Sequence, residues 1–204
     1  HYKSDKEGLI KSVELIKSSE HRTKPSCPQF EKCGGCSLQH ASEKFVSGWK
    51  EEVVSEALRK RNISSPFKSI SISSNFSRRR AAFSARRTKK GTIVGFNERN
   101  SENIISVGGC VVLHPLILKF IVGLEKITAV VCSRSGRVKF FVSTSQNGLD
   151  VVVEGGKKIN LNDVRKLASI ARDYNLARLS WDGELIALLS SPDQKISGIK
   201  VRPP

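Results

Sequence analysis

The sequence is poor in several residue types, and each shortage narrows what the protein can be. Aromatic residues make up only 6% of the chain, which argues against a stacking platform for single-stranded nucleic acid. The longest apolar-rich stretch, 111–131, is interrupted by a histidine, a proline and three charged residues, so no membrane span is expected. The sequence also shows no signal peptide. A reducing, cytoplasmic setting is therefore expected.

Methionine is absent altogether from the 204 residues, and the chain begins at His1. A natural protein of this size normally contains several methionines. Either the chain is a piece of a longer protein, or methionines are missing from the sequence and some spacings are short by one residue.

Acidic residues are also scarce. The chain carries 19 Asp and Glu against 35 Lys and Arg, a formal net charge of +16, and its pI is about 10.0. Such a balance favours a polyanionic partner. The hydrophobic content of 38% suits a folded protein rather than a disordered basic tail, and the length allows one or two domains.

The most informative residues that are present are cysteines. Cys27, Cys33 and Cys36 lie within ten residues, and two glycines separate the last pair. Glycine reaches backbone angles that other residues avoid, so Gly34 and Gly35 let successive sulfurs converge. Converging thiolates bind a soft metal centre. A fourth ligand has to come from elsewhere, and Cys110 is the best candidate.

The spacing alone leaves the type of centre open. Three clustered cysteines plus one distant cysteine are typical of iron–sulfur proteins, whereas structural zinc sites usually show two short knuckles. A disulfide framework fits less well, because the chain is neither small nor dense in cysteine. The fifth cysteine, Cys132, follows an apolar run and is expected to be a buried or half-buried thiol. His40 and His114 are weaker candidate ligands, since a lone histidine near a turn is more often only hydrogen-bonded.

The hydrophobic pattern predicts an α+β fold, with a mostly antiparallel sheet, flanking helices and a cysteine-rich cluster-binding loop near the N-terminus. Two amphipathic helices are predicted over 42–61 and 162–174, the first with Trp49 as a core anchor, and Pro115 is expected to open a third helix toward Ile127. Asn147-Gly148 predicts a type I′ hairpin turn. Strands are predicted over 7–18, 76–88, 92–96, 103–107, 138–144, 149–154, 176–181, 184–190 and 196–202.

A basic patch accompanies the predicted strand 76–88. Its seven cations are Arg78, Arg79, Arg80, Arg86, Arg87, Lys89 and Lys90. Alternate residues of a strand share a face, so these cations would point to both faces. The run is either a solvated edge strand that resists aggregation or a phosphate-binding surface, and the basic composition favours the second. Six further cations could extend the patch: Arg22, Lys24, Arg99, Lys195, Lys200 and Arg202.

The cysteine run, with Gln39 and His40 after it, has the form Cys-x5-Cys-Gly-Gly-Cys-x-x-Gln-His. This pattern resembles the iron–sulfur motif of the bacterial RNA 5-methyluridine methyltransferases, the RlmD/TrmA-like family. The run 19–25 resembles the family's link from an N-terminal TRAM domain, and the run 78–80 resembles an arginine-rich strand of its central domain. The resemblance implies a [4Fe-4S] cluster held by Cys27, Cys33, Cys36 and Cys110.

The resemblance also implies a division into parts. Residues 1–22 would be the C-terminal remnant of a TRAM-like β-barrel, and residues 23–204 would form the central iron–sulfur and RNA-docking domain. The domain that binds S-adenosylmethionine is expected after residue 204. The family's catalytic cysteine and carboxylate match nothing here, and Cys132 lacks the context of the nucleophile. No catalytic residue is therefore assigned.

The function implied is that of the cluster- and RNA-binding part of an S-adenosylmethionine-dependent RNA uracil-C5 methyltransferase, with rRNA favoured over tRNA as substrate. Two alternatives remain. One is a non-catalytic iron–sulfur or zinc RNA-binding protein. The other is an electron-transfer module whose basic surface attracts an acidic redox partner.

Overall fold

The computed structural model describes residues 2–4, 10–66 and 68–203, and only the backbone of residues 2–4 and 10–13. The chain divides into two compact units. One comprises residues 1–26 and 38–71, and the other comprises residues 27–37 and 72–204. Each unit is described by itself.

The first unit contains a short hairpin and one helix. Strand β1 (Tyr2–Ser4) pairs antiparallel with β2 (Ile10–Val13); the first three residues of the predicted strand 7–18 lie outside the described residues, and β2 ends at Val13. Helix α1 (Glu43–Arg59) begins where predicted, because the Ser42 side chain accepts a hydrogen bond from the Phe45 N–H at 3.3 Å and so caps the helix. The assignment of residues 1–22 to a TRAM-like barrel stays a prediction.

The expectation that Trp49 anchors a core is wrong for the structure as described. No residue of α1 is buried among the described residues, and Trp49 is 45% exposed. The apolar face predicted from its four-residue steps exists, and it includes Phe45 and Val53, but these side chains stay largely exposed, although the His21 ring stacks on Phe45 with centroids 4.7 Å apart. Periodicity identifies an apolar face without identifying what covers it.

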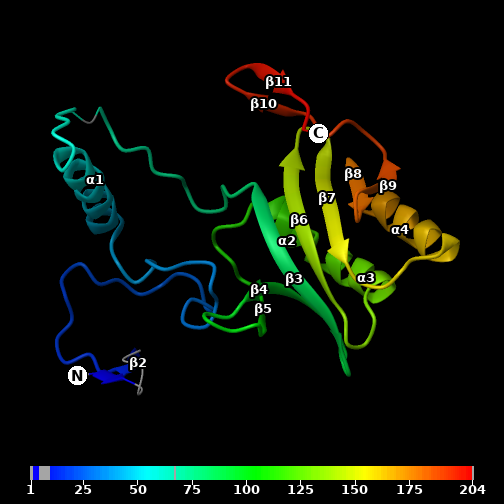
Figure 1. Ribbon diagram of the computed structural model, residues 1–204, viewed down its shortest axis with the longest axis horizontal. Helices are drawn as coiled ribbons and strands as arrows, with labels where there is room; N and C mark the ends of the chain where they lie inside the picture. The colour runs from blue at the N-terminus through cyan, green and yellow to red at the C-terminus, as the bar shows by residue number, and fades with distance from the viewer. Residues whose placement is uncertain (1, 5–9, 67, 204) are drawn as a thin grey trace. The chain divides into compact units, whose positions relative to one another are not determined.

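The second unit is built on a seven-stranded sheet in the order β5-β4-β3-β6-β7-β8-β9 (Figure 1). Its strands are β3 (Arg80–Thr88), β4 (Gly91–Asn97), β5 (Ile104–Ser106), β6 (Arg137–Ser145), β7 (Gly148–Gly155), β8 (Arg178–Trp181) and β9 (Glu184–Leu188). All neighbours pair antiparallel except β7 and β8, which are parallel because α4 (Leu161–Asp173) returns the chain between them. The expected mostly antiparallel sheet is confirmed.

Three helices cover one face of this sheet: α2 (Pro115–Lys119), α3 (Ile121–Val131) and α4 (Figure 1). The predicted helix from Pro115 to Ile127 is divided at Phe120, where ψ rises to −2°. The core lies between sheet and helices and includes Phe83, Phe140, Leu124 and Leu167, which are all under 2% exposed. The opposite sheet face, called the open face below, carries the half-buried and exposed positions of β3 and β6.

The turns follow glycine and asparagine, with one correction. Asn147-Gly148 does connect β6 to β7, but positive φ falls on Gly148 (129°) and not on Asn147, so the predicted type I′ geometry is wrong. Positive φ at both central residues occurs instead at Asp182 (44°) and Gly183 (85°), between β8 and β9. The predicted final strand 196–202 is a hairpin of β10 (Gln194–Ile196) and β11 (Ile199–Val201).

Candidate functional site

The segment Cys27–Ser37, called the cysteine loop, lies beside the turn between β4 and β5. The Gly34 N–H donates to the Asn97 carbonyl at 2.9 Å, and Cys33 forms an antiparallel bridge with Glu98. A Cβ on Gly34 would lie 2.9 Å from the Asn97 oxygen, so only glycine allows the loop to approach this closely. The loop is therefore seated on the edge of the sheet by its own backbone.

Three of the cysteines predicted as ligands, Cys27, Cys36 and Cys110, lie within electrostatic range of the fourth, Cys33. Burial raises the pKa of the Cys33 thiol, the Gly35 N–H that bonds its sulfur lowers it, and the charges of Cys36, Cys27 and Cys110 raise it further. Cys110 thus lies within electrostatic range of a thiol that is far away in sequence. Four thiolates gathered in this way repel one another, and a cation between them would relieve that repulsion.

Cys110 reaches the loop through a tight turn after β5. The Cys110 N–H donates to the Val107 carbonyl at 3.0 Å, and Gly109 has a φ of 75°. A Cβ on Gly109 would lie 3.2 Å from Cγ of Pro28, the neighbour of Cys27. The two distant parts of the cysteine motif therefore touch through the residues next to them.

The four thiols are neighbours, but among the described residues they do not form a preorganised metal site. Cys33, Cys36 and Cys110 are free, half-buried thiols. The alternative of a disulfide framework would have required paired cysteines. Within the part of the chain that the structure describes, no three His, Cys, Asp or Glu side chains already stand where they could hold a metal ion. The role of the four cysteines as cluster ligands therefore stays a prediction.

The remaining candidate ligands have other partners. Cys132 is 1% exposed, and its Sγ donates to the Gly136 carbonyl at 2.9 Å, so the expected buried thiol is confirmed. Nδ1 of His114 accepts a hydrogen bond from the Leu116 N–H at 3.3 Å and caps α2. This is the hydrogen-bonded role that was favoured for this histidine.

The basic strand places its cations on both sides of the sheet, as alternation requires. Arg80 and Arg86 share the open face, whereas Arg87 follows the buried positions of the other face but is exposed at the strand end. Arg78 and Arg79 precede the strand; Nε of Arg78 donates to the Arg80 carbonyl at 3.2 Å. Lys89 and Lys90 are exposed at the turn before β4.

The open face carries two cations that sequence reasoning missed. Arg137 and Lys139 are exposed on β6, where they pair in register with Arg86 and Ser84 of β3. Their signal was the alternation of Arg137, Val138, Lys139 and Phe140 at the start of β6. Arg86 and Arg137 are like charges directly opposite each other, which is unfavourable without a counter-charge. Glu102 supplies part of this counter-charge through a 3.0 Å ion pair with Arg137.

Three of the cations suggested as extensions of the patch are engaged elsewhere. Lys200 and Arg202 both contact Asp193, and the Arg99 side chain bonds carbonyls of the cysteine loop. Lys200, Arg202 and Arg99 therefore have contacts away from the basic patch that they were suggested to extend.

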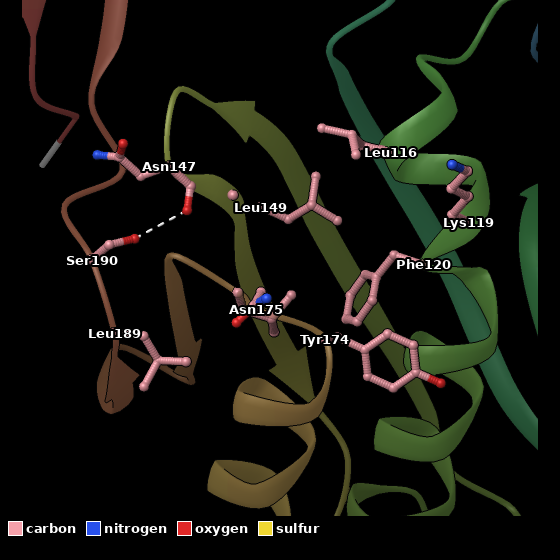
Figure 2. A pocket seen from close by; sticks show the side chains of 11 residues that line it. Leu116, Lys119, Phe120, Asn147, Leu149, Tyr174, Asn175, Leu189 and Ser190 are labelled. Carbon is pink, nitrogen blue, oxygen red and sulfur yellow. Dashed lines mark hydrogen bonds between the residues drawn. The ribbon is translucent and has the colours of Figure 1, made fainter.

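A hollow on the helix side lies between the β6–β7 turn and the ends of α2 and α4 (Figure 2). Phe120 and Tyr174 meet there edge to face, with centroids 5.2 Å apart, and Lys119 lines the rim. The hydroxyl of Ser190 donates to the Asn147 carbonyl at 3.1 Å. The lining contains no nucleophile paired with a general base, so the hollow has none of the features of an active site.

Comparison with curated proteins shows that the chain is similar to proteins named RNA methyltransferases. It is 35% identical over 178 residues to a protein of Brucella suis biovar 1 named an uncharacterized RNA methyltransferase, a match that covers 87% of this chain and 43% of that protein. It is 29% identical over 178 residues to the 23S rRNA (uracil(1939)-C(5))-methyltransferase RlmD of Vesicomyosocius okutanii subsp. Calyptogena okutanii, covering 84% of this chain and 40% of that enzyme. The chain thus spans less than half the length of these relatives.

The fold is also that of a solved relative. The tRNA (uracil-54, C5)-methyltransferase of Pyrococcus abyssi, solved in complex with S-adenosyl-L-homocysteine, matches 99% of this chain and 50% of its own, with a TM-score of 0.61 and 16% identity. No protein-family model matches the chain. The predicted resemblance to RlmD/TrmA-like RNA methyltransferases is confirmed, and membership of the iron–sulfur branch stays a prediction. Among the described residues, every helix falls short of the length and hydrophobicity of a membrane span.

Proposed function

We propose that this chain is the cluster-binding and RNA-docking part of an S-adenosylmethionine-dependent RNA uracil-C5 methyltransferase that acts on rRNA in the cytoplasm. One observation carries the proposal. Cys27, Cys36 and Cys110, from two distant stretches, lie within electrostatic range of Cys33, beside the sheet that carries a cationic open face, in a homologue of RNA methyltransferases.

Cys27, Cys33, Cys36 and Cys110 would hold a [4Fe-4S] cluster. Their surroundings fit thiolate ligation: the Gly35 N–H donates to Sγ of Cys33 at 3.4 Å, a bond that favours a charged sulfur. The group would act as a cross-link between the cysteine loop and the end of β5, so its binding energy would become folding energy. Methyl transfer requires no redox step from it.

Arg80, Arg86, Arg137 and Lys139 would contact the RNA backbone across the open face. Phosphate contacts fix the position of an RNA without reading its sequence, so base recognition would lie on unpaired nucleotides held elsewhere in the enzyme. The name of the RlmD relative supports rRNA. The tRNA enzyme from Pyrococcus abyssi, at 16% identity, supports the fold alone.

Catalysis and S-adenosylmethionine binding are assigned to the part of the enzyme that corresponds to the relatives' remaining length, outside the segment that this chain matches. Cys132, the cysteine outside the predicted cluster, is 1% exposed, so no substrate carbon could reach its sulfur. This segment would therefore supply binding, while the nucleophile and the base come from another domain.

A methylation assay tests the function. Full-length enzyme would be incubated with methyl-labelled S-adenosylmethionine and unmodified transcripts of 23S rRNA or tRNA. We expect 5-methyluridine in the rRNA. Labelling of tRNA alone would contradict the substrate, and labelling of neither RNA would favour a non-catalytic RNA-binding protein.

Metal analysis tests the cluster. Full-length protein purified without oxygen should contain about four irons and four sulfides per chain, with visible absorption that bleaches in air. Cys33→Ser should lose most of this iron, whereas the matched change Cys132→Ser should keep it. Zinc in place of iron would contradict the cluster while preserving the four-cysteine site.

A further inference from the structure

Arg99, in the turn between β4 and β5, reaches three carbonyl oxygens of the cysteine loop. One terminal nitrogen, Nη2, donates to the Cys36 carbonyl at 2.7 Å and to the Phe30 carbonyl at 3.3 Å. Nε donates to the Cys33 carbonyl at 3.4 Å. The same guanidinium lies 5.0 Å from the centroid of the buried Phe30 ring. One side chain thus engages residues on both sides of the Gly34-Gly35 turn.

The backbone around Arg99 is held in place for this task. The Arg99 N–H donates to the Lys32 carbonyl at 3.1 Å, and the Glu98 N–H donates to the Asn103 carbonyl at 2.8 Å. The Asn103 side chain returns a bond to Oε2 of Glu98 at 2.9 Å. The turn is therefore ordered by its own hydrogen bonds, and it presents Arg99 from a rigid sheet.

The chemistry of these contacts requires arginine. A guanidinium presents several N–H groups in a fixed plane and stays charged at every relevant pH. Converging carbonyl dipoles are unfavourable beside one another, and a cation between them removes that cost. Lysine has a single nitrogen on a flexible stem, so it would not reach the same three oxygens in one conformation.

We propose that Arg99 is a positioning residue that holds the main chain of the cysteine loop in a fixed conformation before a metal centre is bound. Its hydrogen bonds fix the main chain of Cys33 and Cys36. Where iron is concerned, the inference rests on the proposed function, because a preformed loop would load faster and release iron more slowly. Its positive charge would also lie beside the negative charge of a thiolate-ligated cluster.

The test uses the full-length protein and four forms: wild type, Arg99→Ala, Arg99→Lys and Arg172→Ala. Arg172 is exposed on α4, so its replacement removes one charge far from the loop in sequence. The first readout is peptide-resolved hydrogen exchange of the metal-free proteins. We expect exchange over residues 29–36 to be about tenfold faster in Arg99→Ala, intermediate in Arg99→Lys and unchanged in Arg172→Ala.

The second readout is iron release to a chelator after anaerobic reconstitution. Arg99→Ala should lose iron about tenfold faster than wild type and Arg172→Ala. If wild type takes up no iron, the proposed cluster fails, but the exchange experiment still decides the role of Arg99. Equal exchange over residues 29–36 in Arg99→Ala and Arg172→Ala would overturn the inference. Acceleration spread equally over residues 137–155 would overturn it as well, because Arg99 would then support the whole unit.

Discussion

At the scale of single residues, three aspartates are buried among the described residues, Asp150, Asp163 and Asp193. Asp193 is 1% exposed and lies 2.7 Å from Nζ of Lys200 and 3.2 Å from Nε of Arg202. Ser191 adds a hydrogen bond at 2.7 Å. These partners lower the pKa of Asp193 to about 2 and tie β11 back to the residues before β10.

This arrangement predicts an acid-sensitive hairpin. The pKa of Asp193 is lower in the folded state than its ordinary value of 3.8, so its stabilising effect is present above pH 4 and is lost as the pH falls toward 2. Hydrogen exchange of residues 194–201 should therefore accelerate over this range in wild type. Asp193→Asn should exchange fast already at pH 6, with Asp173→Asn as a matched control. A hairpin that responds to pH equally in all three proteins would contradict the assignment.

A second buried pair predicts a large loss of stability. Asp150 and Arg178 lie side by side on β7 and β8 and form two hydrogen bonds of 2.8 and 2.9 Å; their side chains are 10% and 19% exposed. Arg178→Ala leaves the carboxylate buried and unpaired, so the free energy of unfolding should fall by about 3 kcal/mol. Urea denaturation measures this free energy of unfolding. The control variant Arg172→Ala should change the free energy of unfolding by less than about 0.5 kcal/mol. A loss below about 1 kcal/mol would show that water solvates Asp150.

At the scale of elements, sequence patterns identified most strands and helices but not what covers them. The alternation of β6 and the Asn160-capped α4 follow from local chemistry, since Asn160 and Asp163 form a capping box. The break between α2 and α3 at Phe120 has no comparable local signal. The exposure of Trp49 could not be predicted from the sequence either. The spacing of apolar residues along a helix identifies an apolar face, but it does not identify which element packs against that face.

Glycine positions give a prediction at this scale. A Cβ at Gly34 would meet the Asn97 carbonyl oxygen, whereas nothing lies within 4 Å of a Cβ at Gly48 in α1. Gly34→Ala should therefore loosen the cysteine loop and speed its hydrogen exchange about tenfold. Gly48→Ala should leave the loop unchanged and stabilise α1 by up to about 1 kcal/mol. Equal exchange of the loop in the two variants would contradict the close packing of Gly34 against β4.

At the scale of the whole molecule, part of the net charge of +16 is concentrated on one face of the sheet. Arg80, Arg86, Arg137 and Lys139 share the open face, and the helices cover the other. The sequence predicted the cations of β3 from their run. It could not predict their neighbours on β6, because cross-strand register is set by pairing between distant segments. Cys110 was already the best candidate for a fourth ligand from the sequence, and the family resemblance implied the same residue.

The open face predicts a specific salt dependence of RNA binding. Arg80→Ala combined with Arg86→Ala should weaken binding of the full-length enzyme to rRNA fragments and reduce the slope of log K against log salt by about 1 to 2. Arg165→Ala combined with Arg172→Ala removes the same charge from exposed positions of α4 and should leave the slope near that of wild type. Equal slopes in the two double variants would place the RNA on another surface.

The largely exposed apolar face of α1 has a practical consequence for handling this segment. A helix of 17 residues with no buried side chain among those described has little to hold it folded beyond its own hydrogen bonds, and such helices are marginal in water. In digests of the 204-residue chain, trypsin should therefore cleave first around Arg59 and Lys60. The sheet that carries Phe83 and Phe140 should persist as a resistant fragment.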